Sequence, residues 1–282
     1  MTGGVDAGVV AGFVAAIAFD VLMPVVVALW ARRRLGVAWK VVTWGALGFA
    51  LSQLFTRVPL VQGLQFVLRD ELKASPALMA AWVVVLSLTA GLFEETARLW
   101  IFRGPLKDFR RWRDAVGYGV GHGGLESALL IGGLAALGLI NMFALSALDP
   151  STLRVPPEVV EEVRKAKETF AQVRWWEPLM GAYERAGSMV LHVALSVLVM
   201  QCFVRGSLRW YWLAVGCHTV SNALGVGGGL LAQKTLGKTA GIVVAEGALT
   251  VFALLGLWVI RRFRPREPEA EGLPSAPAPT ST

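Results

Sequence analysis

The sequence predicts an all-α membrane protein, a polytopic bundle of about seven transmembrane helices. Hydrophobic residues make up 55% of the 282 residues and charged residues only 17%, whereas soluble domains carry about 25% charge. The apolar residues form runs of about 20, the length that crosses a bilayer. Basic residues lie in short segments between these runs, where they set topology. The composition indicates a multi-pass protein of the cell membrane, with the lipid bilayer as its surroundings and no nucleic-acid partner.

Seven apolar runs define the predicted spans, and they lie at residues 7–30, 37–56, 77–102, 115–145, 176–204, 209–232 and 239–261. In the first, Pro24 is expected to produce a kink. That run is long, follows no basic segment or A-x-A site, and ends in three arginines, so we expect a retained span rather than a cleaved signal peptide.

The basic residues predict the orientation of the chain. They follow the first, third, fifth and seventh spans, so all four groups fall on one side of the membrane. Basic loops are typical of the cytoplasmic side. We therefore expect the N-terminus outside and the C-terminus in the cytoplasm.

Two segments are expected outside the bilayer. Residues 156–172 predict an extracytoplasmic amphipathic helix, which either lies on the surface, covers a cavity or is simply solvated. Residues 265–282 are rich in Pro, Ala, Glu and Ser and predict a disordered cytoplasmic tail. The remaining residues, 1–264, are expected to form one transmembrane helical domain.

Two glutamates and an arginine, Glu94, Glu95 and Arg98, lie inside the third predicted span. Charged groups at that depth cost roughly 2.5–3.5 kcal/mol each on insertion scales, so they call for a partner or a function. Neighbouring positions differ by about 100° around a helix, so the two carboxylates face different sides. We expect Arg98 to hold one glutamate and the other to act as a general base or acid, with a slight preference for Glu95 in that role.

All three histidines of the chain lie in predicted spans. His122 and Glu126 are four residues apart in the fourth span, among glycines that permit close helix packing. His218 and Asn222 repeat that spacing in the sixth span, and His192 lies in the fifth. If the third to sixth spans surround a cavity, these residues converge with the glutamate pair.

Such a set suits several kinds of chemistry. Two or three neutral imidazoles and a carboxylate suit zinc, with a further glutamate as base for a bound water. The same residues suit metal-free hydrolysis, in which Asn222 donates to an oxyanion. A buried polar network that only holds helices together and a proton or ion pathway are the other interpretations.

Three motifs are similar to those of a known group of membrane proteins, and they are Glu94-Glu95-x-x-Arg98, the glycine-rich span that ends in Glu126, and His218-x-x-x-Asn222. The chain resembles the superfamily that joins CAAX-processing and bacteriocin-processing (CPBP) proteases, PrsW proteases and the Aph subunits of gamma-secretase. Within this group, the run from Tyr118 to Glu126 resembles the YhfC family of intramembrane metalloproteases. The resemblance extends from the first span to the seventh.

The resemblance implies a peptidase in which one of Glu94 and Glu95 activates water, and in which Asn222 steadies an oxyanion. It also maps the later family histidines to His192 and His218. The fourth span departs from the CAAX-protease pattern because it offers Glu126 four residues after His122. Which histidines are ligands, and whether a metal binds, stay open on these grounds.

We therefore predict hydrolysis of a peptide bond in or near the bilayer, in a membrane-associated peptide or protein substrate. The candidate catalytic residues are Glu94, Glu95, Arg98, Glu126 and Asn222, and the candidate zinc ligands are His122, His192 and His218. A non-catalytic scaffold or assembly subunit of the Aph type is one alternative. A proton-coupled transporter, in which Asp20 and Glu246 are further stations for protons, is the other.

Overall fold

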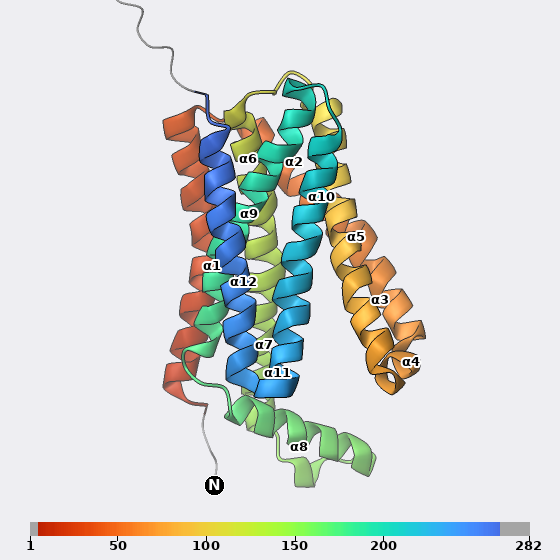
Figure 1. Cartoon of the computed structure of the whole chain (residues 1–282). Coiled ribbons are helices and arrows are strands. Elements are labelled where there is room, and N and C mark those ends of the chain that lie inside the picture. The colour runs from red at the N-terminus through yellow and green to blue at the C-terminus, as the bar shows by residue number, and fades with distance from the viewer. Residues whose placement is uncertain (1–4, 266–282) are drawn as a thin grey trace, which may run out of the picture.

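The computed structural model describes residues 5–265, and within them the chain is helical with no strand (Figure 1). The predicted tail lies outside the described residues apart from its first residue, Pro265. In chain order the elements are α1 (Ala7–Leu35), α2 (Trp39–Phe49), η1 (Ala50–Arg57), α3 (Val58–Val67), α4 (Arg69–Ala74), α5 (Pro76–Arg103), α6 (Trp112–Leu125), η2 (Glu126–Ile131), α7 (Gly132–Ala147), η3 (Pro150–Thr152), α8 (Pro157–Ala171), α9 (Glu177–Val204), α10 (Arg209–Asn222), η4 (Ala223–Gly228), α11 (Gly229–Leu236) and α12 (Lys238–Arg262).

Five helical segments of the described chain are long and apolar enough to cross a membrane, and they are Ala7–Leu35, Pro76–Arg103, Trp112–Ala147, Glu177–Val204 and Lys238–Arg262. The other two predicted spans fall within helical runs that pass through short π-helical segments, from Trp39 to Val67 and from Arg209 to Leu236. Those two runs do not meet the same length and composition criterion. The helices thus follow the sequence-based order, and five of the seven predicted spans have a matching candidate.

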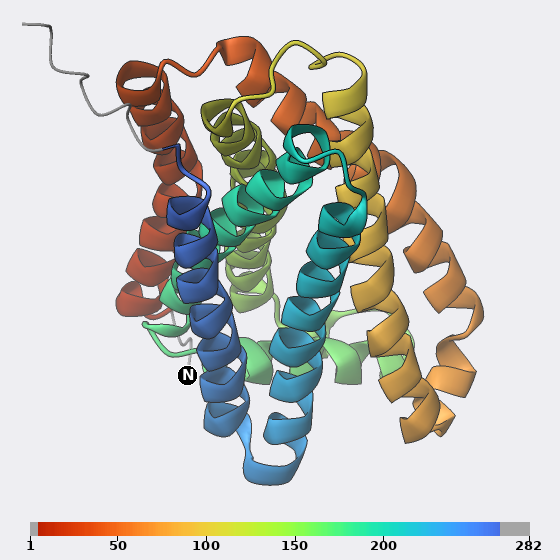
Figure 2. The ribbon, with the colours of Figure 1, turned by 45° about the horizontal axis from the view of Figure 1, so that its top comes forward.

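Helix α9 lies in the middle of the bundle. Of its most apolar stretch 78% is buried, against 6–28% for the other four candidate spans. It packs against α1, α6, α10 and α12, and Figure 2 shows it crossing behind α12. Because its surroundings are protein rather than lipid, polar side chains on α9 face neighbouring helices. This position is where a buried site is expected.

Two glycines of α6 allow that helix to pass between α9 and α2. A side chain at Gly119 would collide with the backbone of Val193 on α9, and one at Gly121 would collide with the backbone of Val42 on α2. Small residues permit such close contact between membrane helices. The close packing predicted from the glycine-rich segment is therefore present, and it fixes His122 next to α9.

Three π-helical segments interrupt the α-helices, at η1, η2 and η4. The first contains Gln53 and Arg57, the second begins with Glu126, and the third directly follows Asn222. A π turn shifts the side chains that follow it around the helix axis and is frequent at functional sites. All three segments thus carry or adjoin polar residues that bear on the candidate site.

The basic segments meet at one end of the bundle, the top in Figure 1. Arg113 donates to the carbonyl of Leu35 at the end of α1. The indole of Trp112 donates to the carbonyl of Ile260 in α12 at 3.0 Å. Helix α8 lies across the opposite end of the bundle, and none of its residues is fully buried (Figure 1). It matches the predicted amphipathic helix closely, with bounds that differ by one residue at each end.

Candidate metal centre

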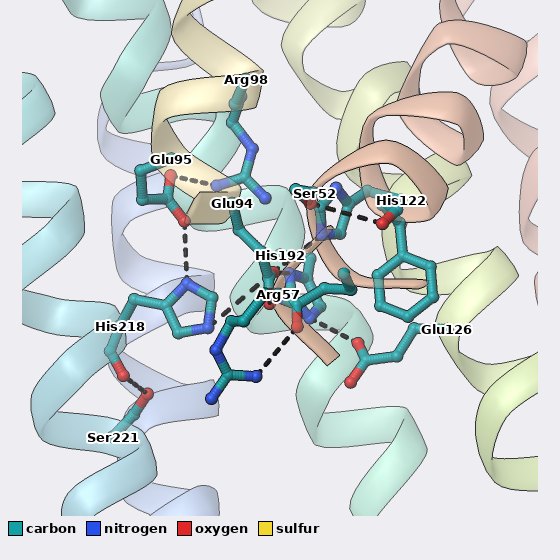
Figure 3. Close-up of polar contacts among 12 residues, drawn as sticks. Ser52, Arg57, Glu94, Glu95, Arg98, His122, Glu126, His192, His218 and Ser221 are labelled. Atoms are coloured by element: carbon teal, nitrogen blue, oxygen red, sulfur yellow. Dashed lines mark hydrogen bonds and ion pairs between the residues drawn. The ribbon is translucent and has the colours of Figure 1, made fainter. Parts of the chain in front are cut away.

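The glutamate pair of α5 points to two different partners (Figure 3). Glu95 is fully buried and is paired with Arg98, one turn further along the helix. Glu95 also accepts a hydrogen bond from Nδ1 of His218 at 2.9 Å. Glu94, also buried, turns toward His122 and His192. As expected, only one glutamate is held by the arginine, but it is Glu95, the reverse of the sequence-based preference.

All three histidines converge on the carboxylate of Glu94. Its Oε2 lies 2.8 Å from Nε2 of His122, 3.8 Å from Nδ1 of His192 and 3.9 Å from Nε2 of His218. The ring centres of His122 and His192 are 4.8 Å apart, and those of His192 and His218 are 5.8 Å apart. The four side chains come from α5, α6, α9 and α10, so the third to sixth predicted spans do meet at one place.

Two of the imidazoles have an acid on the side away from Glu94. Glu95 binds Nδ1 of His218, as described above, and Oε2 of Glu126 lies 2.7 Å from Nε2 of His192. Acids in this position orient metal-binding histidines and fix which ring nitrogen carries the hydrogen. The hydrogen bond to Glu95 turns the Nδ1 hydrogen of His218 away from Glu94, so Nε2 of this ring presents its lone pair toward Glu94. Glu126 lies at ion-pair distance from His192 and forms no hydrogen bond with it.

The charges of the centre leave Glu94 without a cationic partner. Arg98 balances Glu95, and Arg185 lies 3.0 Å from Oε1 of Glu126. Within residues 5–265, no Lys or Arg nitrogen lies at ion-pair distance from Glu94. A buried carboxylate without a Lys or Arg partner has a negative charge to be compensated. A divalent cation would supply that compensation.

The donor set fits a metal ion. One ligand atom each of Glu94, His122 and His192 can be chosen so that all three lie within 4.8 Å of one another. The ligands of tetrahedral zinc, at about 2.0–2.2 Å from the ion, stand about 3.3–3.6 Å apart. The Glu94–His122 pair, at 2.8 Å, would therefore open slightly, while the wider pairs would close. Nδ1 of His192 has no hydrogen-bond partner in the described chain, which leaves it available. Two histidines and a glutamate form one of the common catalytic zinc sets.

Gln53, which lies near the end of the second predicted span, is not among the residues identified from the sequence. Gln53 is buried and donates to Oε1 of Glu94 at 2.7 Å. Arg57 in turn donates to Oε1 of Gln53 at 2.9 Å and to Oγ1 of Thr89 at 3.1 Å. The four-residue spacing of Gln53 and Arg57 is the one local signal, and it falls in the π-helical segment η1, where the α-helical period does not hold.

Asn222 stands apart from the others. It ends α10, one turn after His218, and is only partly buried. No hydrogen bond from its side chain is found within residues 5–265. Of the eight candidate residues, seven are joined by direct contacts (Glu94, Glu95, Arg98, Glu126, His122, His192 and His218), and Asn222 is not among them.

Comparisons with known proteins identify the family of the chain. A family model described as YhfC intramembrane metalloprotease matches residues 19–247. The uncharacterized membrane protein YhfC of Bacillus subtilis (strain 168) is 29% identical over 252 residues, which cover 88% of this chain and 93% of the relative. No solved structure matches the chain. The matched region includes every residue of the buried centre, and the chain belongs to the YhfC family of membrane proteins.

Proposed function

We propose that the chain is an intramembrane peptidase that hydrolyses a peptide bond in or near the bilayer, with zinc held by Glu94, His122 and His192. The observation that carries this proposal is the convergence of three imidazoles on one buried carboxylate that has no Lys or Arg partner within residues 5–265. The description of the matching family model, an intramembrane metalloprotease, supports it. When bound, zinc would polarise the substrate carbonyl and acidify a water molecule.

His218 is the proposed proton carrier. Glu95 accepts the hydrogen of Nδ1, so the free lone pair of this ring lies on Nε2, 3.9 Å from Glu94. A water between these groups would give its proton to Nε2, and the same nitrogen would return the proton to the leaving amine. This moves His218 from the predicted ligand set to a catalytic role. It also changes the role of the glutamate that faces the proposed water. Glu94 becomes a zinc ligand rather than the general base.

The remaining residues position these groups. Arg98 neutralises Glu95, and Gln53 fixes the rotamer of Glu94. Glu126 holds His192 from behind. Asn222 stays the proposed oxyanion donor, because it lies one helical turn from His218 at the start of a π segment.

A non-catalytic scaffold is the second candidate, and one observation favours it. The polar centre is closed: His122 and Glu95 are 0% exposed and Glu94 is 6% exposed. A network in which charged groups are already paired also serves to hold helices together. Peptide hydrolysis requires water and substrate to enter this centre, whereas a scaffold does not.

We also infer seven crossings of the membrane, with the basic end of the bundle in the cytoplasm and α8 outside. The two helical runs through η1 and η4 complete the five apolar spans, and the basic segments share one end of the bundle. We also propose that the chain is related to the wider superfamily of CPBP proteases, PrsW proteases and Aph subunits.

The proposal is tested by mapping protein N-termini in membranes of cells that produce either wild type or Glu94→Gln at equal levels. A peptidase generates new N-termini, in or next to membrane spans, that are absent with Glu94→Gln. Arg164→Ala on α8, far from the centre, is the control and should behave as wild type. Identical N-termini in all three samples would support the scaffold instead.

A further inference from the structure

A line of polar side chains leads from the buried centre toward the α8 end of the bundle. Nδ1 of His192 lies 3.8 Å from Glu94, and Nε2 of the same ring lies 2.7 Å from Glu126. Arg185 lies 3.0 Å from Glu126 and 2.5 Å from Glu184. The line is therefore continuous, with no step longer than 3.8 Å.

The two ends of this line differ in exposure. The side chain of Glu184 is 50% exposed, that of Glu126 is 19% exposed and that of His192 is 4% exposed. Glu184 lies seven residues after the start of α9, about 10 Å along the axis, and His192 lies about 12 Å deeper. The line thus connects the half-exposed surface near α8 to the closed centre.

Three side chains, on α1, α9 and α12, have buried polar atoms without hydrogen-bond partners within residues 5–265. Nε of Arg185, Oδ1 of Asp20 on α1 and Oε2 of Glu246 on α12 have no hydrogen-bond partner in the described part of the chain. Asp20 is only 1% exposed, and the charges of Arg185 and Glu184 reach both acids. Proteins pair nearly all buried polar atoms, with ordered water where no protein group is available. The arrangement around Arg185 fits internal water.

On the opposite side of the centre, Arg98 and Tyr118 lie one helical turn away and have buried polar atoms without hydrogen-bond partners in the described chain, and the residues around and beyond them are mostly apolar. Beyond His192, α9 continues with Leu195, Val197 and Val199, which are at most 1% exposed. They pack into two apolar clusters between the centre and the basic end of the bundle. Polar side chains therefore connect the centre to the α8 end, whereas mostly apolar side chains separate it from the basic end.

We propose that Glu184, Arg185 and Glu126 line a water-entry path from the α8 side to the buried centre, with Asp20 and Glu246 as its walls. Four acids and one arginine, of which Glu126 and Glu184 contact Arg185 directly, keep the path polar through the apolar half of the bundle. Asp20 and Glu246, which the transporter interpretation treats as stations for protons, thus line a route that reaches the centre from one side only. The role of this water in hydrolysis rests on the proposed function. The presence of water along the path does not.

Thiol accessibility tests the path on the full-length protein in detergent. Cys202 and Cys217, the two natural cysteines, are first replaced by alanine. Two buried serines of α9 then form a matched pair, since Ser188 lies four residues before His192 on the α8 side and Ser196 lies four residues after it. Each is changed to cysteine, with the half-exposed Glu184→Cys as positive control. The probe is Ag⁺, which is similar in size to water and does not enter apolar regions. A cysteine that has reacted with Ag⁺ is detected because a maleimide added later, in denaturant, no longer labels it.

The path predicts that Ser188→Cys reacts at least about tenfold faster than Ser196→Cys. Ser127→Cys provides a second site, because the Ser127 hydroxyl contacts the backbone of Asp20, and it should also react fast. Equal rates for Ser188→Cys and Ser196→Cys, or a faster Ser196→Cys, would overturn the path. This readout does not require cleavage. An inactive protein with a reactive Ser188→Cys would contradict the proposed function and support the path. An active protein with an unreactive Ser188→Cys loses only the path.

Discussion

Glu95 accepts a hydrogen bond from Nδ1 of His218 at 2.9 Å, and this contact joins α5 to α10 across the buried centre. It gives the two adjacent glutamates different tasks. Glu95 contacts Arg98 and Nδ1 of His218, whereas the carboxylate of Glu94 lies close to a ring nitrogen of each of the three histidines. The predictions below separate the residues that would hold a metal from the residues that would act around it.

The first prediction concerns His218. Because His218 is proposed to carry a proton rather than bind metal, His218→Asn should lower turnover about 10²-fold or more while the zinc content stays near that of wild type. His192→Asn should lower both. The measurement is zinc content and cleavage on the same preparations, and a loss of zinc in His218→Asn equal to that in His192→Asn would restore His218 to the ligand set.

Gln53 provides the second prediction. It donates to the oxygen of Glu94 that does not face the histidines, so Gln53→Leu should free that carboxylate to rotate. Loss of such a supporting contact weakens metal binding roughly 10–100-fold. Competition with a chelator measures this change. Ser52→Ala is the matched control, because Ser52 is the adjacent buried residue and its hydroxyl donates only to the carbonyl of Phe49. Equal zinc affinity in the two variants would contradict the role of Gln53.

The buried pair of Arg98 and Glu95 gives a prediction about stability. Arg98→Met leaves a carboxylate buried without its cation, which costs roughly 3–5 kcal/mol. The midpoint of thermal unfolding in detergent should fall clearly, and the double variant Arg98→Met/Glu95→Gln should recover part of the loss. Arg164→Ala removes an ion pair on exposed α8 and should leave the midpoint unchanged. No drop in Arg98→Met would show that the buried pair does not stabilise the fold.

The orientation of the chain is a fourth prediction. Ser151 precedes α8, and Lys107 lies between α5 and α6 at the basic end; both are exposed. In intact cells of a strain with the natural cysteines replaced, a membrane-impermeant maleimide should label Ser151→Cys and leave Lys107→Cys unlabelled until the cells are opened. The reverse pattern would invert the proposed topology.

Much of this arrangement follows from the sequence alone. The apolar runs located the helices, and the i, i+4 spacing of His122 and Glu126 placed polar groups inside the bundle. Helix geometry also required Glu94 and Glu95 to face different partners. Which of them meets Arg98 depends on how α5 is rotated against α10, and tertiary packing alone sets that rotation.

The π-helical segments explain what the sequence did not reveal. A π turn changes which side chains share a helix face, so the 3.6-residue period fails at η1 and does not reveal that Gln53 faces Glu94. At η4 the π turn begins only after Asn222, so it does not account for the position of Asn222 outside the network. Asp20 and Glu246 lie near opposite ends of the chain, and no local pattern predicts that the charge of Arg185 acts on both.

The zinc content of purified protein, measured by mass spectrometry after incubation with zinc and buffer exchange, tests the central claim most directly. The account predicts about one zinc ion per chain in wild type, and its loss in His122→Ala/His192→Ala with the helical content unchanged. Wild type that holds no more zinc than this double variant would contradict the metal centre.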